Sequence, residues 1–235
     1  RICQRQNDSH KIDSHKTGGF MDKKKIVITI NREYGSGGRS IGKILSKRLG
    51  ISYYDDEIIK LSSEYSAVAE EYFRMHDERP GNNLFQKVMG TSKANLSKPS
   101  ISDNITSPDN LFRFESEVIR NIANRESCIF IGRCADFVLD SCAFPEYISI
   151  FVYADLTTKI RRIMDLDGLE TKEALEKISK IDKRRASYYK YYTGEDWLDM
   201  SRYDLPINTS SLEFEEACDL ILYYLKLRKY SIPQS

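Results

Sequence analysis

A glycine-rich turn near the start of the chain carries residue types that suit a phosphate site. Its residues, in order, are Gly35, Ser36, Gly37, Gly38, Arg39 and Ser40. The turn follows an apolar, β-branched run at 26–30 and precedes an amphipathic stretch at 40–49. Glycines let successive backbone N–H groups converge on an anion, and the N-terminus of the next helix adds partial positive charge. A plain strand-to-helix turn is the alternative, but so many small residues at the end of a first strand favour phosphate binding.

The phosphate-loop pattern G-x-x-x-x-G-K-[ST] can be placed on this region in two registers. In the first, residues 37–43 supply the glycines and the lysine, but Ile44 stands where a hydroxyl should bind Mg²⁺. That register also puts Lys43 on the solvent side of the amphipathic helix. We therefore favour the register that ends at Ser40, whose hydroxyl would bind the metal.

The favoured register lacks the usual lysine, because Gly38 occupies its place. The positive charge that a lysine would bring to the phosphates must then come from Arg32 or Arg39, which lie beside the loop. We therefore expect phosphate groups to bind through Arg32 and residues 35–40.

Further arginines stand at places where they could contact a ligand. Arg133 follows the apolar run 127–131 and Gly132, so it is expected at the carboxyl edge of the sheet, where ligands bind in open α/β proteins. For Arg161 and Arg184, which lie in predicted helices, a solvated helix face is as good an interpretation as function.

The elements that must position these residues alternate between strands and helices. The predicted strands are 26–30, 51–54, 127–131, 147–153 and 204–208, and Pro206 favours an edge or a strand end for the last. The predicted helices are 40–49, a segment from about 57 through 61, 64–76, 111–122, 156–163, 171–192 and 214–225. This alternation predicts a three-layer α/β fold, with a parallel sheet of about five strands and helices on both faces.

Composition narrows the classes of function. The chain has 36 Lys and Arg against 35 Asp and Glu, a formal net charge of +1, which argues against nucleic acid as a partner. No apolar run approaches the roughly 18 residues that a membrane span requires, so no membrane partner is expected. The five cysteines form no C-x-x-C pair, which favours buried free thiols in a reducing cytoplasm over a zinc site or disulfides.

The chain is expected to contain one main domain. Residues 1–21 are polar and lack apolar periodicity, which indicates a disordered leader or a remnant of an expression sequence. The domain would span 22–230. Within it, residues 79–110 are rich in Pro, Gly, Ser, Asn and Lys, which is typical of a mobile loop or lid.

The run from Ile28 to Lys43 resembles the opening of the cytidylate kinase-like proteins, relatives of bacterial cytidylate kinase among the nucleoside monophosphate kinases. The likeness continues at 54–56, at 131–133, through the strand at 147–153 and in the later arginines, and it covers about 25–228 with a poor match at 65–110. It implies a P-loop fold and ATP- and Mg²⁺-dependent transfer of a phosphoryl group to a nucleoside monophosphate, with CMP or dCMP as first candidate. Such chemistry depends mainly on positioning and charge neutralisation.

The resemblance also implies roles for single residues. Arg39, Arg162 and Arg184 would be catalytic, and a lid would span about 160–195. Asp55, at the start of the monophosphate-binding helix, would bind the acceptor together with Arg133 and Arg185, and 65–110 would be a mobile acceptor-binding insertion. A planar guanidinium suits bidentate binding of phosphate. The partners would be small nucleotides, and the protein a monomer or homodimer.

The chain departs from true cytidylate kinases at the acceptor site. Cys134 and Ala186 stand where those enzymes have aspartates, and Gly38 replaces the phosphate-loop lysine. Two alternatives therefore stay open: a nucleotide-binding regulator with little catalysis, and a kinase of a different small acceptor. The tyrosines between 188 and 192, with Trp197, could stack on a base or pack as the apolar side of a helix.

Overall fold

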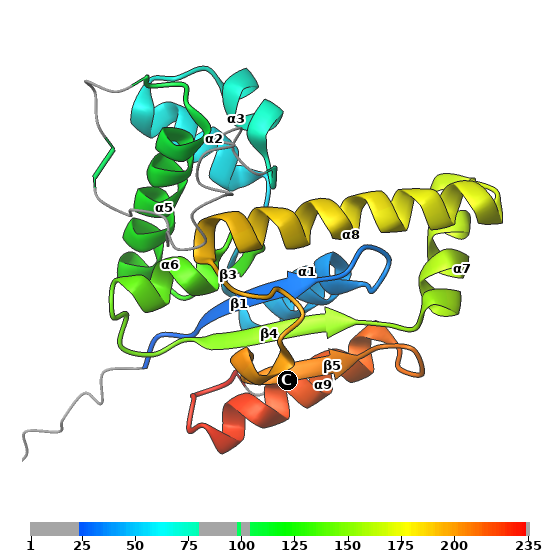
Figure 1. The fold of residues 1–235 in the computed structure, drawn as a ribbon. Coiled ribbons are helices and arrows are strands. Elements are labelled where there is room, and N and C mark those ends of the chain that lie inside the picture. The colour runs from blue at the N-terminus through cyan, green and yellow to red at the C-terminus, as the bar shows by residue number, and fades with distance from the viewer. Residues whose placement is uncertain (1–23, 80–97, 100–103, 234–235) are drawn as a thin grey trace, which may run out of the picture.

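A five-stranded parallel sheet lies between two layers of helices in the computed structural model, which describes residues 24–79, 98–99 and 104–233 (Figure 1). The spatial order of the strands is β2-β3-β1-β4-β5, and every neighbouring pair is parallel. The strands are β1 (Val27–Arg32), β2 (Ser52–Tyr54), β3 (Cys128–Ile131), β4 (Ile148–Tyr153) and β5 (Leu205–Asn208). The predicted fold class is confirmed, and Pro206 lies on an edge strand as expected.

Helices cover both faces of the sheet. One face carries α1 (Gly38–Leu49) and α9 (Phe214–Leu227), which share an apolar cluster with β1, β3 and β4. The other face carries α5 (Pro108–Arg125), α6 (Ala135–Ser141) and the C-terminal part of α8 (Thr171–Thr193). Because side chains alternate along a strand, neighbours such as Val27 and Ile28 enter different clusters.

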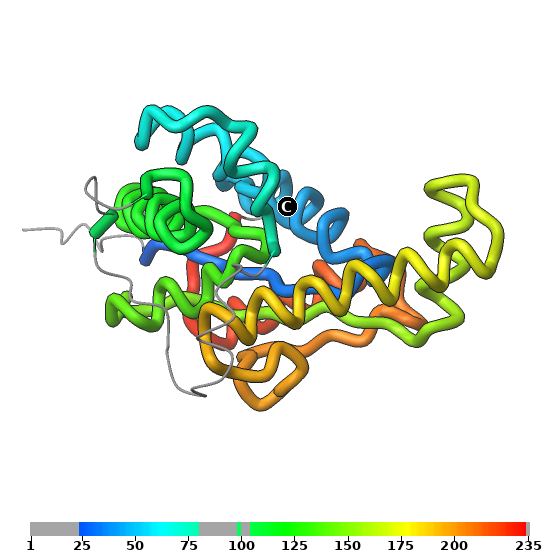
Figure 2. The backbone as a smooth tube through the Cα atoms, turned by 45° about the horizontal axis from the view of Figure 1, so that its top comes forward, coloured from blue at the N-terminus to red at the C-terminus, as the bar shows by residue number. Residues whose placement is uncertain are grey.

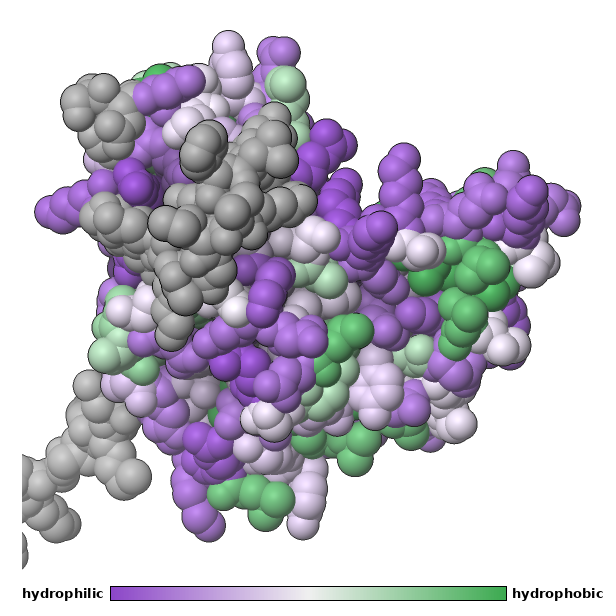
Figure 3. Space-filling view, viewed as in Figure 1, coloured by the Kyte–Doolittle hydropathy of each residue, from purple (hydrophilic) through white to green (hydrophobic). Residues whose placement is uncertain are grey.

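Two helical units extend beyond the sheet. At one end, α2 (Glu57–Ser66) and α3 (Glu70–His76) pack near α5. At the other end, α7 (Leu156–Asp167) and the N-terminal half of α8 form a projecting hairpin (Figure 2). In the view of Figure 3, apolar side chains gather over this hairpin, and further apolar patches lie along the lower part of the molecule. Within the described ranges, no helix has the length and apolar character that crossing a bilayer demands.

The turn between β1 and α1 depends on glycine conformations. Gly35 and Gly37 have φ values of 82° and 91°, in the left-handed region that side chains disfavour. A Cβ atom on Gly37 would also overlap the ring of Phe214. The glycines are therefore needed both for the shape of the turn and for its close packing against the start of α9.

Several expectations need correction. The stretch predicted as helical over 64–76 is the end of α2 and then α3, separated at Ala67, whose φ is 57°. Helix α5 begins at Pro108, with Ser107 as its cap, rather than at 111. Helix α6 and a 3₁₀ turn at Met200–Arg202 were not predicted. The leader at 1–21 and most of the loop at 79–110 lie outside the described residues.

The aromatic side chains near the end of α8 are packed in the core. Tyr188, Tyr189, Tyr192 and Trp197 are buried together with side chains of α5, α6 and β4. The ring centroids of Tyr192 and Phe112 lie 3.9 Å apart. These rings stabilise the packing of α8 on the sheet. The structure therefore supports the interpretation of these aromatic residues as apolar packing rather than as a base-stacking surface.

Candidate functional site

The N-terminus of α1 is open to an anion. The N-cap, Gly37, has no side chain to cap the helix, and the first turn contains no acidic residue. The first N–H groups of a helix have no partner within it, and they carry partial positive charge. Arg39 and Ser40 are exposed in this first turn, and Lys43 is exposed one turn later. The predicted phosphate loop therefore has the geometry of an anion site. The register that we rejected covers residues 37–43, and all of these except Gly37 lie within α1.

Two side chains from outside the loop donate hydrogen bonds to its backbone. Arg162 Nη1 donates a hydrogen bond to the carbonyl oxygen of Ser36 at 3.2 Å, and the hydroxyl of Thr209 donates to the same oxygen at 2.7 Å. Arg162 also bonds the carbonyl oxygen of Thr209 at 2.8 Å, and its guanidinium lies 4.9 Å from the ring centroid of Phe214. Burial lowers the pKa of Arg162, with Arg161 adding to the effect. Arg162 therefore supports the loop backbone, a role its sequence position did not reveal.

A second cluster connects the loop to the α7–α8 hairpin. Lys159 Nζ lies 3.1 Å from the carboxylate of Glu33 and 3.2 Å from that of Asp182. The same Asp182 accepts a 2.7 Å hydrogen bond from the backbone N–H of Tyr34. The buried Lys159 thus contacts both the residue after β1 and a residue of α8.

An ion-pair chain runs along the carboxyl edge of the sheet toward the start of α2. Arg39 Nε lies 2.7 Å from Asp55 Oδ2, and Arg133 Nη1 donates to the backbone oxygen of Asp55 at 2.7 Å. Arg133 is buried and also lies 2.9 Å from Asp77 Oδ1. The structure thus brings together Arg39, Asp55 and Arg133, three residues predicted for this site.

Glu78 joins two further arginines. Its Oε1 accepts a 2.5 Å hydrogen bond from Arg32 Nη1, and its Oε2 accepts one of 3.0 Å from Arg185 Nε. All three side chains are buried. Burial alone would raise the pKa of Glu78, but the two guanidiniums hold it far below its ordinary value. Burial, together with the charge of Arg32, lowers the pKa of Arg185 to about 10.

Glu115, on α5, is a buried carboxyl at the margin of this cluster. Burial raises its pKa to about 8, against the lowering effect of Arg133, and Asp77 and Glu78 add to the rise. Glu115 is therefore mainly protonated and uncharged at neutral pH.

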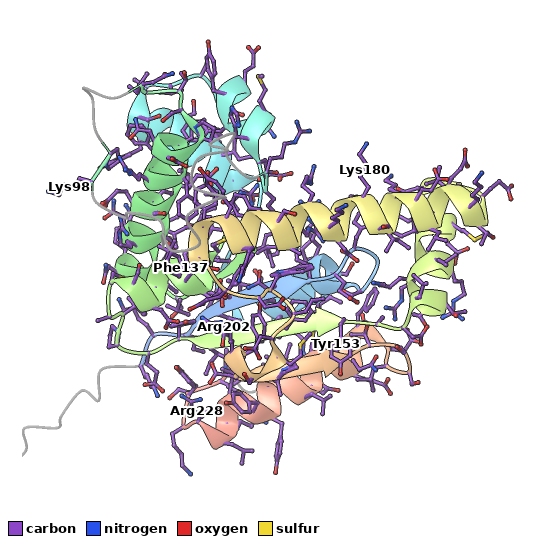
Figure 4. The ribbon with its side chains drawn as sticks, viewed as in Figure 1. Lys98, Phe137, Tyr153, Lys180, Arg202 and Arg228 are labelled. Carbon is purple, nitrogen blue, oxygen red and sulfur yellow. The ribbon has the colours of Figure 1, made fainter. Side chains whose placement is uncertain are left out.

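Arg161 and Arg184, the two other arginines considered in the sequence analysis, lie in different environments. Arg161 is exposed on α7. Arg184 is half-buried on α8, and its Nε has no hydrogen-bond partner among the described residues. The outer side of α8 is solvated, as Lys180 shows by projecting away from the sheet (Figure 4). Arg185 lies on the inner side of α8, and Arg161 and Arg184 do not join the cluster around Glu78.

Sequence reasoning did not identify several residues of the site: Asp77, Glu78, Glu115, Lys159 and Thr209. Asp77 and Glu78 precede the stretch that was interpreted as a loop, where no periodicity marks them. Lys159 and Thr209 could only be found from the fold, because their partners lie far away in the sequence.

The residues around the loop fit the phosphates of a nucleoside triphosphate and the Mg²⁺ ion that accompanies it. The open N–H groups of α1 suit phosphate oxygens, and exposed Arg39 adds charge beside them. The exposed Ser40 hydroxyl offers one oxygen of the kind that Mg²⁺ accepts, and phosphates and water commonly supply the others.

The fold and the loop define a class of protein. A parallel sheet in the order β2-β3-β1-β4-β5, with a glycine-rich anion loop between its central strand and the first helix, is the arrangement of a P-loop kinase. The model of the cytidylate kinase-like family matches residues 27–211. The chain therefore belongs to the cytidylate kinase-like family, and this membership supports a nucleotide kinase activity.

Known proteins similar to this chain span most of its length. The cytidylate kinase of Sulfolobus acidocaldarius is 27% identical over 197 residues, 84% of this chain and 92% of that protein. The cytidylate kinase of Sulfurisphaera tokodaii is 25% identical over 200 residues, 85% and 95% of the two chains.

A solved structure is also similar. It is an uncharacterized protein from Eubacterium ventriosum, 27% identical, with a TM-score of 0.62 and coverage of 86% of this chain and 99% of that one.

Proposed function

We propose that this protein transfers the γ-phosphoryl group of ATP, with Mg²⁺, to a nucleoside monophosphate, and that CMP or dCMP is the first candidate acceptor. The observation that carries the proposal is the position of the open N-terminus of α1 beside the arginine cluster at the carboxyl edge of the sheet. The relatives named cytidylate kinase support the choice of acceptor.

On this proposal, the two substrates bind on the two sides of Arg39. The loop at 35–40 holds the phosphates of ATP. Arg39 supplies charge that the missing lysine would have brought, and Arg32 adds to it once its ion pair with Glu78 opens. Asp55, Arg133 and Arg185 hold the acceptor. When bound, Mg²⁺ neutralises negative charge on the phosphates, and Ser40 contributes a ligand.

The chain's own contribution is to position the phosphates and to stabilise charge on the group in transfer. Arg184 on α8, whose Nε has no hydrogen-bond partner among the described residues, is proposed to donate to the group in transfer. Arg162 acts as a positioning residue, because its guanidinium already bonds the carbonyl oxygen of Ser36 in the loop and that of Thr209, which follows β5.

A catalytically weak regulator that binds nucleotide is the second candidate. It is favoured by Gly38 in the place of the lysine and by the pairing of Arg32 with a carboxylate. A kinase of another small acceptor is the third, favoured by Cys134, which is buried at the start of α6 where true cytidylate kinases carry an aspartate. In each case we propose a cytoplasmic protein, monomeric or homodimeric.

One panel of assays distinguishes these candidates. The protein is incubated with ATP and Mg²⁺ and with each nucleoside monophosphate in turn, and ADP formation is followed. Turnover with CMP or dCMP supports the proposal. Tight binding of ATP without turnover on any monophosphate favours the regulator, and absence of ATP binding contradicts all three candidates.

A further inference from the structure

The arginines expected to bind phosphate already hold carboxylates of the chain itself. Arg32 and Arg185 contact the two oxygens of Glu78 at 2.5 and 3.0 Å. Arg133 Nη2 lies 2.9 Å from Asp77 Oδ1. Each of these guanidiniums is therefore paired with one of the two residues that follow α3.

The charges in this buried cluster balance. The buried guanidiniums of Arg32, Arg133 and Arg185 and the half-exposed one of Arg39 face four carboxylates, which belong to Asp55, Asp56, Asp77 and Glu78. A phosphate monoester brings a charge close to −2 at neutral pH. Adding it to a balanced, buried cluster would leave negative charge uncompensated, which is costly away from water. A phosphate group can therefore enter only if a carboxylate leaves.

The position of Glu78 does not follow from helix packing. Its φ is 46°, in the left-handed region that a residue with a Cβ disfavours. Helix α3 has only seven residues, and Phe73 is the one it buries. Glu78 itself is only 5% exposed, so its ion pairs, rather than the helix before it, hold it in place. A segment held mainly by ion pairs can be displaced by a ligand whose anionic group binds the same arginines more tightly.

We propose that Asp77 and Glu78 form an internal carboxylate plug, which occupies the phosphate-binding arginines when no substrate is bound and is displaced by the phosphate of the acceptor. The plug regulates the proposed kinase site, so this inference rests on the proposed function. The ligand class that displaces it is a phosphate monoester dianion. An acceptor that offers only a neutral hydroxyl group would leave the plug in place.

Two different roles for Glu78 predict opposite effects of removing its charge on the binding of phosphate. If Glu78 served only to orient Arg32 and Arg185 for substrate, then removal of its charge would weaken phosphate binding. If Glu78 competes with phosphate, the same change strengthens binding, because the affinity of the free protein is reduced by the fraction of molecules in the plugged state.

The test uses Glu78→Gln, which keeps the shape of the side chain and removes its charge. Inorganic phosphate is titrated into the full chain by calorimetry. We expect the dissociation constant for phosphate to fall by about tenfold or more in this variant, as for a plug that is closed in about 90% of molecules. Asp77→Asn, at a more exposed position with one arginine partner, should change the constant less and in the same direction.

Asp219→Asn is the control. Asp219 is paired with Arg48 on the α1–α9 face, so this variant removes one negative charge far from the cluster, and phosphate binding should not change. Unchanged or weaker phosphate binding by folded Glu78→Gln protein would overturn the plug. If that variant does not fold, Asp77→Asn decides, and no gain in its phosphate affinity overturns the proposal.

A separate assay keeps the two proposals apart. Turnover of nucleoside monophosphates is measured for wild type and for both variants. If none is phosphorylated while Glu78→Gln gains phosphate affinity, the proposed function fails and the plug stands. If wild type is an active kinase and Glu78→Gln gains no affinity, the plug alone fails.

Discussion

Arg162 and Ser36 lie in different parts of the chain, and a 3.2 Å hydrogen bond from the Arg162 guanidinium to the Ser36 carbonyl oxygen joins them. This bond helps to hold the backbone of the loop at the residue directly before Gly37, the N-cap of α1. It also ties the shape of the loop to α7, which carries Arg162.

Arg162→Ala should weaken ATP binding by about tenfold or more, because a hydrogen bond from a charged donor contributes roughly 1.5–3 kcal/mol. Titration calorimetry with ATP and Mg²⁺ measures the change. Arg161→Ala is the matched control, since Arg161 is the exposed neighbour on the same helix. Equal losses in the two variants would contradict a specific role of Arg162 in holding the loop.

Arg39→Ala should weaken nucleotide binding more than Lys43→Ala does. Arg39 lies in the first turn of α1 beside the open N–H groups, whereas Lys43 is exposed one turn further on, with its Nζ 6.0 Å from the ring centroid of Tyr53. We expect at least about a fivefold difference in dissociation constant, which corresponds to about 1 kcal/mol. Equal effects, or a larger effect at Lys43, would mean that the loop register is wrong.

Gly37→Ala should destabilise the protein by more than the roughly 1–2 kcal/mol that a left-handed conformation costs a residue with a Cβ. The excess arises because a Cβ atom at this position overlaps the ring of Phe214. Gly50→Ala is the control, since Gly50 has a φ of 65° and an added Cβ would meet nothing within 4 Å. Urea unfolding of both variants gives the two free energies of unfolding.

A second substitution checks the cause of that loss. In the Phe214→Ala background, Gly37→Ala should cost about as much as Gly50→Ala does. If the excess persists when the ring is gone, the contact between Gly37 and Phe214 is not its source.

Glu115 should make stability fall as the pH rises. Its pKa is about 8 in the folded protein against an ordinary value of 4.5, so the folded state keeps a proton that the unfolded chain releases. The stabilisation is full below the unfolded value and is lost progressively as the pH rises from about 4.5 through about 8.

The measurement for this effect compares wild type with Glu115→Gln, which mimics the protonated carboxyl. The melting temperature of wild type should fall relative to that of the variant as the pH is raised through this window. Parallel curves would show that Glu115 does not carry a raised pKa.

Much of the fold could be predicted because its signals are local. The β-branched runs that became β1, β3 and β4 are buried on both faces, and such strands read as continuous apolar stretches. The glycine-rich turn between β1 and α1 was recognised for the same reason, since its glycines are close together in sequence. Helix α6 was missed because it is short and starts directly after Arg133 and Cys134, which both have positive φ values.

The charge partners could not be predicted, because they depend on contacts between distant segments. Arg32 and Glu78 are 46 positions apart, and Arg185 and Glu78 are 107 apart. The positions of Arg32, Arg133 and Arg185 suggested free guanidiniums for substrate. The structure shows each of them paired with an acidic side chain, and this finding leads to the proposed plug.

Transfer of label from ATP is the most direct test of the proposed kinase. The protein is incubated with Mg²⁺, ATP labelled in its γ-phosphoryl group and either CMP or dCMP, and the nucleotides are separated. We predict label in the nucleoside diphosphate, with none when the acceptor is omitted. Bound ATP with no labelled diphosphate from any nucleoside monophosphate would contradict the proposal that this protein is a nucleoside monophosphate kinase.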